Sequence, residues 1–318
     1  MPVKTLPLLV LVACAAPSGS NDDTPDAPPG STDGAADSPS SPDAAQPFSW
    51  PTCGTTAFDH FELYYGHSIA VADDGTVFHA FYDGGEEYVS RYRPGQPLER
   101  TWSHVGPGST GVGALAVSPA GVPFALLRTS DDRTQLARLT PNVIPIGTPL
   151  QTTSGPTALA FSPDGILFEA SFTGLRRVDP TTGTRTPVSE PMMLREIYFV
   201  GSRVLRGVTY DHGLVEITLD AAATSSTFTT IFPFTTLALQ YSGVDQLGRT
   251  YALIHEMSTD KLVRFDPTFA TRETLVQYPS VSIVFGKLAF GRGALRCDVL
   301  VTGFDVGRVA TNDTPGVP

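Results

Sequence analysis

Short apolar runs alternate with tight polar turns along residues 49–318, and the same pattern recurs six times. In the third copy, an apolar segment at 159–161 leads into the turn SPDG at 162–165, and a second apolar run follows at 166–172. The corresponding turn glycines are Gly75, Gly121, Gly165, Gly248 and Gly293, with spacings of 46, 44, 83 and 45 residues, the third spanning two copies. Such a period indicates one supersecondary unit repeated around an axis.

Each copy has the texture of β-structure, because runs rich in Val, Leu, Phe and Tyr are separated by glycine-containing turns, without helical periodicity. The first copy predicts four strands, at 68–72, 76–82, 87–93 and 98–105. Four-stranded units repeated around a channel form a β-propeller. The sequence therefore predicts an all-β, six-bladed propeller. A long β-sandwich and a β-helix are the alternatives, although this period is too long for the coils of a β-helix.

The sixth copy predicts only three strands, at 287–291, 297–303 and 306–311. A strand-like segment before the first copy, about 53–64, belongs to no copy. We expect this N-terminal strand to join the last blade as its outermost strand and to close the ring.

The first residues differ from the rest. An apolar run at 6–13 follows Lys4, and the sequence LVAC at 11–14 resembles the lipobox of bacterial lipoprotein signal peptides. The resemblance implies that residues 1–13 are a signal peptide, removed before Cys14, and that the Cys14 thiol is acylated. A plain secretory signal is the alternative. The apolar run is too short to span a bilayer.

Residues 14–48 are expected to be a disordered tether that carries the lipid at its first residue. From 15 to 47 the segment consists almost entirely of Ala, Pro, Ser, Gly, Thr and Asp, with no basic residue, so it cannot bury enough apolar surface to fold. The expected organisation is one folded domain, residues 49–318, on an exported protein. We expect it to be anchored in the outer membrane, with a periplasmic or surface-facing propeller.

The whole chain has a net charge of −11. Without Lys4 and the six tether aspartates, the propeller has 20 basic and 26 acidic residues and a net charge of −6. No basic patch is evident, which argues against a nucleic-acid partner. We expect a monomer.

Two cysteines remain once Cys14 is acylated. Cys53 and Cys297 are an even pair in an oxidising compartment. Both are predicted at the same end of the last sheet, where a disulfide would hold the ring closed. Two buried free thiols are the alternative, because an intervening strand can separate them beyond disulfide reach.

Catalytic motifs are mostly absent from the sequence. The segment GPGSTG at 106–111 has the wrong register for a nucleophile elbow, and HEMST at 255–259 lacks the second histidine of a zincin helix. No catalytic residue is assigned.

The segment GPTALAFSPDG at 155–165, with the six-fold period, resembles the gluconolactonase (senescence-marker-protein) and NHL-repeat group of six-bladed propellers. The resemblance covers residues 66–318. For the lactonases of this group, the resemblance implies a divalent metal, usually calcium, in the central channel. Side chains at the starts of the innermost strands hold that metal. The equivalent positions here are His67, Gly113, Thr157, Arg195, Gln240 and Gly286.

None of these six residues is a carboxylate, whereas calcium prefers charged oxygen ligands. A slip of one residue would bring in Glu196, but not a set of three ligands. We therefore expect no metal site and no cofactor, with calcium possible only if the protein is a divergent lactonase.

The channel mouth predicts a different chemistry. Arg195 offers a fixed fork of donors and His67 a titratable donor, with Thr157 and Gln240 nearby, a combination suited to a small carboxylate or sugar acid. The alternative is that backbone carbonyls or acids of neighbouring loops satisfy these side chains.

The loops between the second and third strands open on the same face and are rich in carboxylates. The predicted acidic rim consists of Asp83, Glu86, Asp131, Asp132, Asp211, Glu256 and Asp260. Such a face can dock a basic or cation-bridged partner. The alternative is a solvated rim in which the aspartates serve the turns.

Two functions follow. The first is a lipid-anchored, non-enzymatic module of the cell envelope that binds a small carboxylate, a sugar acid or an envelope protein. The alternative is a divergent, metal-dependent lactone hydrolase that has rebuilt its metal site from the acidic loops.

Overall fold

The structure is a computed structural model. It describes residues 60–61, 66–83, 86–93, 96, 99–103, 109–151, 156–210, 213–233, 238–256, 259–279, 287–292, 298–301 and 306–310. The chain divides into two units, 1–47 and 48–318. The predicted signal peptide, the predicted lipidation site Cys14 and the predicted tether lie outside the described residues, so the fold below is that of the second unit. No helix in the described part of the chain is long and apolar enough to cross a membrane.

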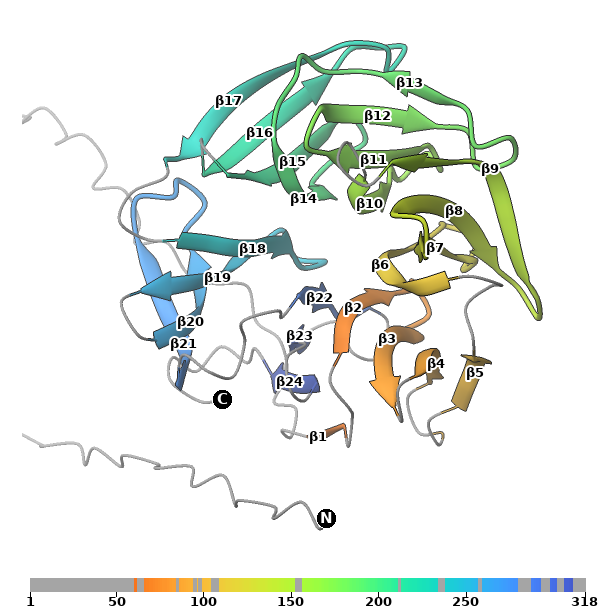
Figure 1. The fold of residues 1–318 in the computed structure, drawn as a ribbon. Helices are drawn as coiled ribbons and strands as arrows, with labels where there is room; N and C mark the ends of the chain where they lie inside the picture. The colour runs from red at the N-terminus through yellow and green to blue at the C-terminus, as the bar shows by residue number, and fades with distance from the viewer. Residues whose placement is uncertain are drawn as a thin grey trace, which may run out of the picture. The chain divides into compact units, whose positions relative to one another are not determined.

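Five sheets each contain four consecutive antiparallel strands, and we call them blades 1 to 5 (Figure 1). Blade 1 contains β2 (Gly66–Val71), β3 (Val77–Asp83), β4 (Glu86–Tyr92) and β5 (Glu99–Ser103). Blade 2 contains β6 (Ser109–Val117), β7 (Pro123–Thr129), β8 (Arg133–Leu139) and β9 (Val143–Gln151). Blade 3 contains β10 (Pro156–Phe161), β11 (Leu167–Ser171), β12 (Gly174–Val178) and β13 (Arg185–Pro187). Blade 4 contains β14 (Leu194–Phe199), β15 (Val204–Thr209), β16 (Leu214–Leu219) and β17 (Ser226–Phe232). Blade 5 contains β18 (Ala238–Val244), β19 (Thr250–Glu256), β20 (Thr259–Phe265) and β21 (Arg272–Pro279).

The sixth sheet is assembled from both ends of the folded unit. It contains β22 (Leu288–Phe290), β23 (Asp298–Val301), β24 (Val306–Ala310) and β1 (His60–Phe61). The short strand β1 pairs antiparallel with β24, with His60 opposite Gly307 and Phe61 opposite Val306. The prediction that an N-terminal strand closes the last blade from outside is therefore confirmed, with two residues of the predicted 53–64 described as strand.

The sheets form a closed ring. Each innermost strand (β2, β6, β10, β14, β18 and β22) contacts the innermost strand of the next sheet, and β22 contacts β2. The predicted all-β propeller with four-stranded blades is confirmed.

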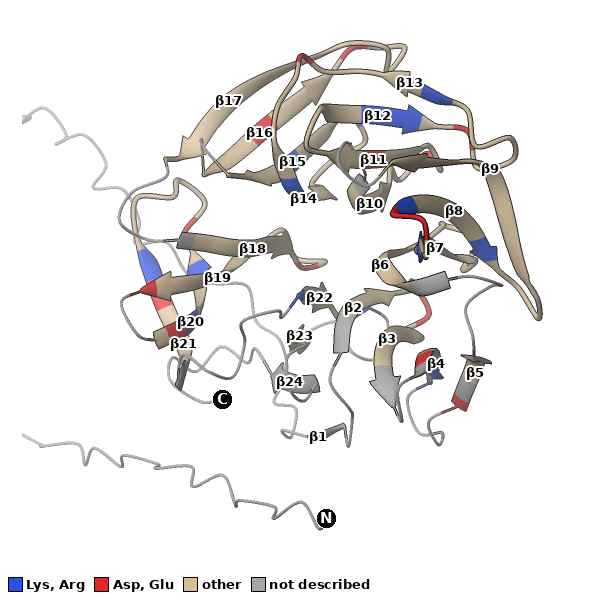
Figure 2. Cartoon of the chain, viewed as in Figure 1, with Lys and Arg blue, Asp and Glu red and all other residues tan. Residues whose placement is uncertain are grey.

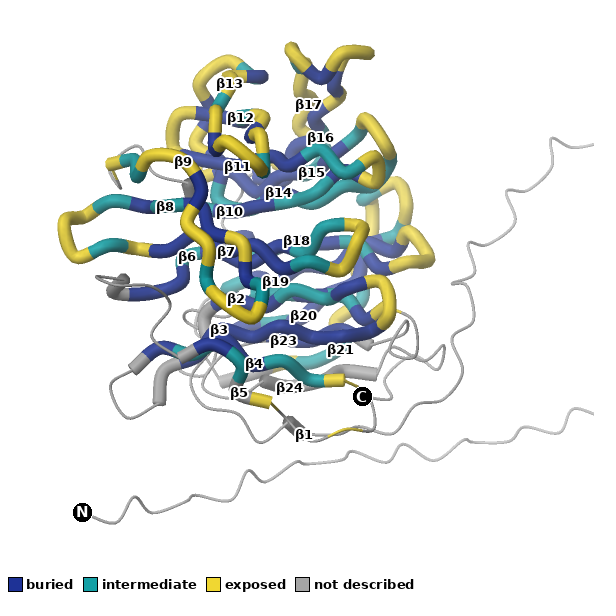
Figure 3. Tube along the Cα trace, turned by 90° about the vertical axis from the view of Figure 1, so that its right-hand side faces the viewer, coloured by how far each residue is buried: buried dark blue, intermediate teal, exposed yellow. Residues whose placement is uncertain are grey.

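The hydrophobic core lies between the sheets. Each of six buried clusters joins two neighbouring sheets, which is expected when four-stranded blades can bury their two faces only against one another. The cluster that closes the ring contains Ile69 and Val77 of blade 1 with Ala289 and Leu300 of the sixth sheet. Figure 3 shows the same arrangement, with buried residues along the strands and exposed residues in the turns.

The repeated glycines fix the turn after four of the innermost strands, β2, β6, β10 and β18. Gly75, Gly121, Gly165 and Gly248 have φ values of 86°, 76°, 80° and 78°, a conformation that costs glycine little and other residues about 1–2 kcal/mol. In the third copy, the Gly165 amide donates to the Ser162 carbonyl, and the Ser162 hydroxyl accepts from the Ile166 amide. The glycine period in the sequence is thus the period of this turn.

Candidate functional site

The predicted mouth residues share one local structure, because each is the extra residue of a β-bulge in an innermost strand. In β14, Leu194 lies opposite Thr209 and Glu196 opposite Val208, so Arg195 has no cross-strand partner. The same irregularity occurs at the other predicted positions within the described residues, namely His67, Gly113, Thr157 and Gln240. Gly286 lies outside those residues. Bulges redirect a side chain out of the ladder and are common next to active sites.

The surroundings of Thr157 and Gln240 differ. The Thr157 hydroxyl donates a hydrogen bond of 2.7 Å to the Leu194 carbonyl, so it links blade 3 to blade 4. Gln240 is half-buried, directly before Tyr241 in β18. The side chain of His67 lies outside the described part of the chain.

Arg195 contacts two aromatic rings. Its guanidinium carbon is 5.5 Å from the ring centroid of Tyr210 and 5.0 Å from that of Tyr241. Tyr210 directly follows β15 of blade 4, and Tyr241 belongs to β18 of blade 5, so two blades hold one arginine. Cation–π contacts with two rings restrict the movement of the guanidinium, and such contacts do not use its N–H groups as hydrogen-bond donors to oxygen. Within the described residues, no carboxylate forms an ion pair with Arg195.

The next residue of the bulge is engaged elsewhere. The Glu196 carboxylate forms an ion pair of 3.4 Å with the Lys287 ammonium, which comes from the residue before β22. Lys287 also lies 5.9 Å from the ring centroid of Tyr241. The pair therefore joins the innermost edge of blade 4 to that of the sixth sheet, and it leaves the charge of Arg195 uncompensated by Glu196.

The predicted acidic rim is partly neutralised in blade 2. The Asp131 carboxylate lies 3.2 Å from the Arg133 guanidinium and accepts a hydrogen bond from the Thr129 hydroxyl. Asp132 occupies the left-handed region, with φ 59°, at the tip of the same turn. These aspartates serve the β7–β8 turn.

The rim residues of blade 5 are paired as well. The Lys261 ammonium donates a hydrogen bond of 2.6 Å to Glu256, which is the main reason why the pKa of Glu256 is below its usual range. Asp260 lies 2.7 Å from His255 Nδ1. The side chains of Asp83 and Glu86, and all of Asp211, lie outside the described residues. Figure 2 shows acidic and basic residues interspersed over the ring rather than separated.

The described residues do not fit a calcium cage. No group of three or more His, Cys, Asp or Glu side chains among them is placed to hold a metal ion. At the bulge positions, the described side chains are those of threonine, arginine and glutamine, and Glu196 is bound to a lysine. Calcium prefers several oxygen ligands, carboxylates among them, and the described residues of this mouth do not offer such a set.

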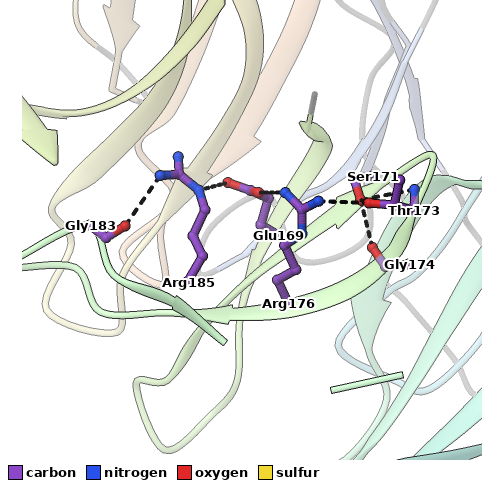
Figure 4. Close-up of polar contacts among 7 residues, drawn as sticks. All are labelled: Glu169, Ser171, Thr173, Gly174, Arg176, Gly183 and Arg185. Atoms are coloured by element: carbon purple, nitrogen blue, oxygen red, sulfur yellow. Dashed lines mark hydrogen bonds and ion pairs between the residues drawn. The ribbon is translucent and has the colours of Figure 1, made fainter. Parts of the chain in front are cut away.

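A second group of charges lies inside blade 3 and was missed by the sequence analysis. Glu169, in β11, is fully buried and forms ion pairs with Arg185 at 2.9 Å and Arg176 at 3.4 Å (Figure 4). Arg185 also donates to the Gly183 carbonyl and Arg176 to the Thr173 hydroxyl. The sequence signal that could have revealed this group is a single glutamate inside an apolar run. Arg176 and Arg185 follow it on the next two strands of the same blade.

Neither a family model nor a curated protein matches this sequence. Solved structures do match. A streptogramin B lyase is 12% identical, with 79% of this chain and 96% of that chain covered and a TM-score of 0.56. A gluconolactonase from Xanthomonas campestris is 11% identical, with coverages of 78% and 86% and a TM-score of 0.57. A protein of unknown function from Bacteroides thetaiotaomicron is 12% identical, with coverages of 80% and 72% and a TM-score of 0.55.

Similarity at this level of identity shows the fold alone. The fold implied by the resemblance to the gluconolactonase group agrees with these neighbours, which include a gluconolactonase.

Proposed function

We propose that this chain is a non-enzymatic binding propeller of the bacterial cell envelope, which recognises a small carboxylate or sugar acid at the mouth of its channel. The observation that carries the proposal is the state of Arg195. It is the extra residue of a bulge, it forms cation–π contacts with Tyr210 and Tyr241, and no described carboxylate forms an ion pair with it.

The physical basis is the geometry of a guanidinium. A planar fork of N–H donors matches a carboxylate with two parallel hydrogen bonds, and the neighbouring tyrosine rings limit the rotation that binding would otherwise have to freeze. Glu196 would compete for Arg195, but its ion pair with Lys287 engages it. An anion that enters the mouth therefore meets a cation without a described counter-ion.

Calorimetry with gluconate, glucuronate, acetate and succinate tests the proposal. We expect Arg195→Ala to weaken binding by about 1.5–3 kcal/mol, roughly 10- to 150-fold, the range for hydrogen bonds to a charged group. Arg133→Ala is the matched control, because Arg133 is a rim arginine already paired with Asp131. Equal loss in both variants, or the absence of any binding by the unmodified chain, contradicts the proposal.

We further propose that the protein is a monomer attached to the outer membrane through a lipid on Cys14. The lipobox-like segment LVAC and the aspartate-rich tether support this attachment. Because one lipidated thiol is the only attachment that this segment offers, Cys14→Ser should move the protein from the membrane fraction to the soluble fraction. Retention of the variant in the membrane would refute the anchor.

A divergent lactone hydrolase is the second candidate. The likeness in fold to a gluconolactonase from Xanthomonas campestris favours it. Its metal would have to be held by carboxylates from the acidic loops, in a set that includes residues outside the described part of the chain. Metal analysis of the purified chain, with a panel of lactones, separates the two candidates. Bound calcium and calcium-dependent lactone hydrolysis would replace the binding proposal, and turnover that survives Arg195→Ala would strengthen that conclusion.

A further inference from the structure

Exposed apolar side chains gather beside Arg195. Six large hydrophobic side chains in the described residues are more than about a third exposed, and three of them are Phe172 (36%), Met193 (44%) and Tyr210 (43%). The rings of Phe172 and Tyr210 are 5.7 Å apart, and the Tyr210 amide donates to the Met193 carbonyl at 3.2 Å. Single exposed apolar residues are ordinary, whereas a contiguous group of them indicates a binding surface.

The topology explains why these residues meet. Met193 directly precedes β14 and Tyr210 directly follows β15, and the pairing of Leu194 with Thr209 places the two side by side. Phe172 lies in the turn between β11 and β12 of blade 3, next to blade 4. We call Phe172, Met193 and Tyr210 the apolar patch. It lies at the edge of the blades where β14 begins, which is the edge that carries Arg195.

The apolar patch is continuous with the proposed anion site. The Tyr210 ring contacts Phe172 at 5.7 Å and the guanidinium of Arg195 at 5.5 Å, so one ring belongs to both surfaces. A ligand whose carboxylate binds Arg195 can therefore reach exposed aromatic rings with the rest of its body. Hydroxyl groups placed there would lose water without gaining a partner, whereas an aromatic ring would gain stacking contacts.

Resting on the proposed function, we propose that the ligand class of this site is the aromatic carboxylates. The carboxylate is held by Arg195, and the ring is held against Tyr210 and Phe172. This narrows the earlier class of small carboxylates and sugar acids, and it commits to a small molecule. A peptide that ends in an aromatic residue is a different occupant, which the test distinguishes.

The experiment uses calorimetry on the full chain with four probes. Phenylacetate offers both groups, acetate only the carboxylate, benzyl alcohol only the ring, and gluconate a carboxylate with hydroxyls. We expect phenylacetate to bind about threefold to tenfold more tightly than acetate or gluconate, from one aromatic contact. Phe172→Ala should remove that advantage, so that phenylacetate and acetate bind with similar affinity. The control is Phe228→Ala, at another exposed phenylalanine (46%) on the outer strand β17, and it should change the affinity for neither probe.

The outcomes separate this inference from the proposed function. If Arg195→Ala weakens acetate, gluconate and phenylacetate alike and Phe172→Ala changes nothing, the aromatic inference is overturned and the anion site stands. If Arg195→Ala has no effect on any probe, the proposed function fails. Tight binding of a peptide with a C-terminal phenylalanine, without binding of phenylacetate, overturns the small-molecule class. Phe172→Leu keeps the apolar volume and removes the ring, so it gives the same test if Phe172→Ala does not fold.

Discussion

Two groups of charged residues in neighbouring blades are treated by the fold in opposite ways. In blade 3, Glu169 is fully buried and contacts two arginines, Arg176 and Arg185 (Figure 4). In blade 4, Arg195 is half-buried, contacts two tyrosine rings and has no described carboxylate partner. In blade 3 the charges are paired with one another and offer little for a ligand to bind. The arrangement in blade 4 has a charge for which the described residues supply no counter-ion.

Strand register explains the difference. Glu169 lies in a regular ladder, directly opposite Arg176 on the next strand, so the sheet itself sets glutamate and arginine side by side. Arg195 is the extra residue of a bulge and has no residue opposite it. A ladder therefore pairs charges, and a bulge releases one from pairing. Arginine side chains thus stabilise blade 3 as partners of Glu169, whereas Arg195 is available for binding at the mouth.

The largest effect is expected from breaking the closed group. Glu169→Gln leaves the Arg176 and Arg185 guanidinium groups without their anion in a buried setting, which should lower the free energy of unfolding by about 3–5 kcal/mol. Urea unfolding followed by tryptophan fluorescence and circular dichroism measures it. Glu99→Gln is the control, because Glu99 pairs with Arg91 at the surface and its removal should change stability little. Similar losses in the two variants would show that burial of Glu169 does not decide its role.

A smaller effect on stability is expected at the mouth. Arg195→Ala should lower the free energy of unfolding by about 1 kcal/mol, since it removes two cation–π contacts and no described ion pair. The same variant should show the affinity loss predicted above. If Arg195→Ala instead unfolds the protein as severely as Glu169→Gln, the arginine is part of the core, and the contrast between the two regions is wrong.

The ring and the positions of the mouth residues could be predicted from the sequence, but the contacts of Arg195 and Glu169 could not. The turn glycines predicted the ring because the positive φ at Gly75, Gly121, Gly165 and Gly248 favours glycine. The repeat of glycine in the sequence therefore follows the repeat of the blades. The mouth residues were predicted from their repeat position. The aromatic rings around Arg195 were not, because they come from other strands and another blade. Glu169 was missed because a ladder partner is set by register, which one sequence does not show.

The cysteine pair stays a prediction for a related reason. Cys53 and Cys297 lie outside the described residues. In the sequence, Cys53 lies seven residues before β1 and Cys297 directly precedes β23, and β24 lies between those two strands. Strands two positions apart are about 10 Å apart, beyond the Cα separation of a disulfide. A bond would require the segments before both strands to turn towards each other past the end of β24.

The smallest effect on stability is expected from carboxylates that accept hydrogen bonds from their own turn rather than from arginine. Asp179, Asp220 and Asp266 each follow the third strand of a blade and accept hydrogen bonds within their own turns. These bonds keep the pKa of each below its usual value, through the Thr181 amide for Asp179, the Ser225 amide for Asp220, and the Thr268 hydroxyl for Asp266. They are exposed, so each contribution to stability is small.

The direction of the pH effect follows from those shifts. A carboxylate whose pKa is lower in the folded state than its unfolded value of about 3.9 stabilises the fold above that pH, and the stabilisation is lost as the pH falls towards the folded-state pKa. Urea midpoints should therefore decrease below about pH 4, and Asp266→Asn should make the decrease shallower. Asp164→Asn, at an exposed aspartate in the turn after β10, is the matched control. An equal change in both variants would mean that the acid sensitivity does not come from Asp266.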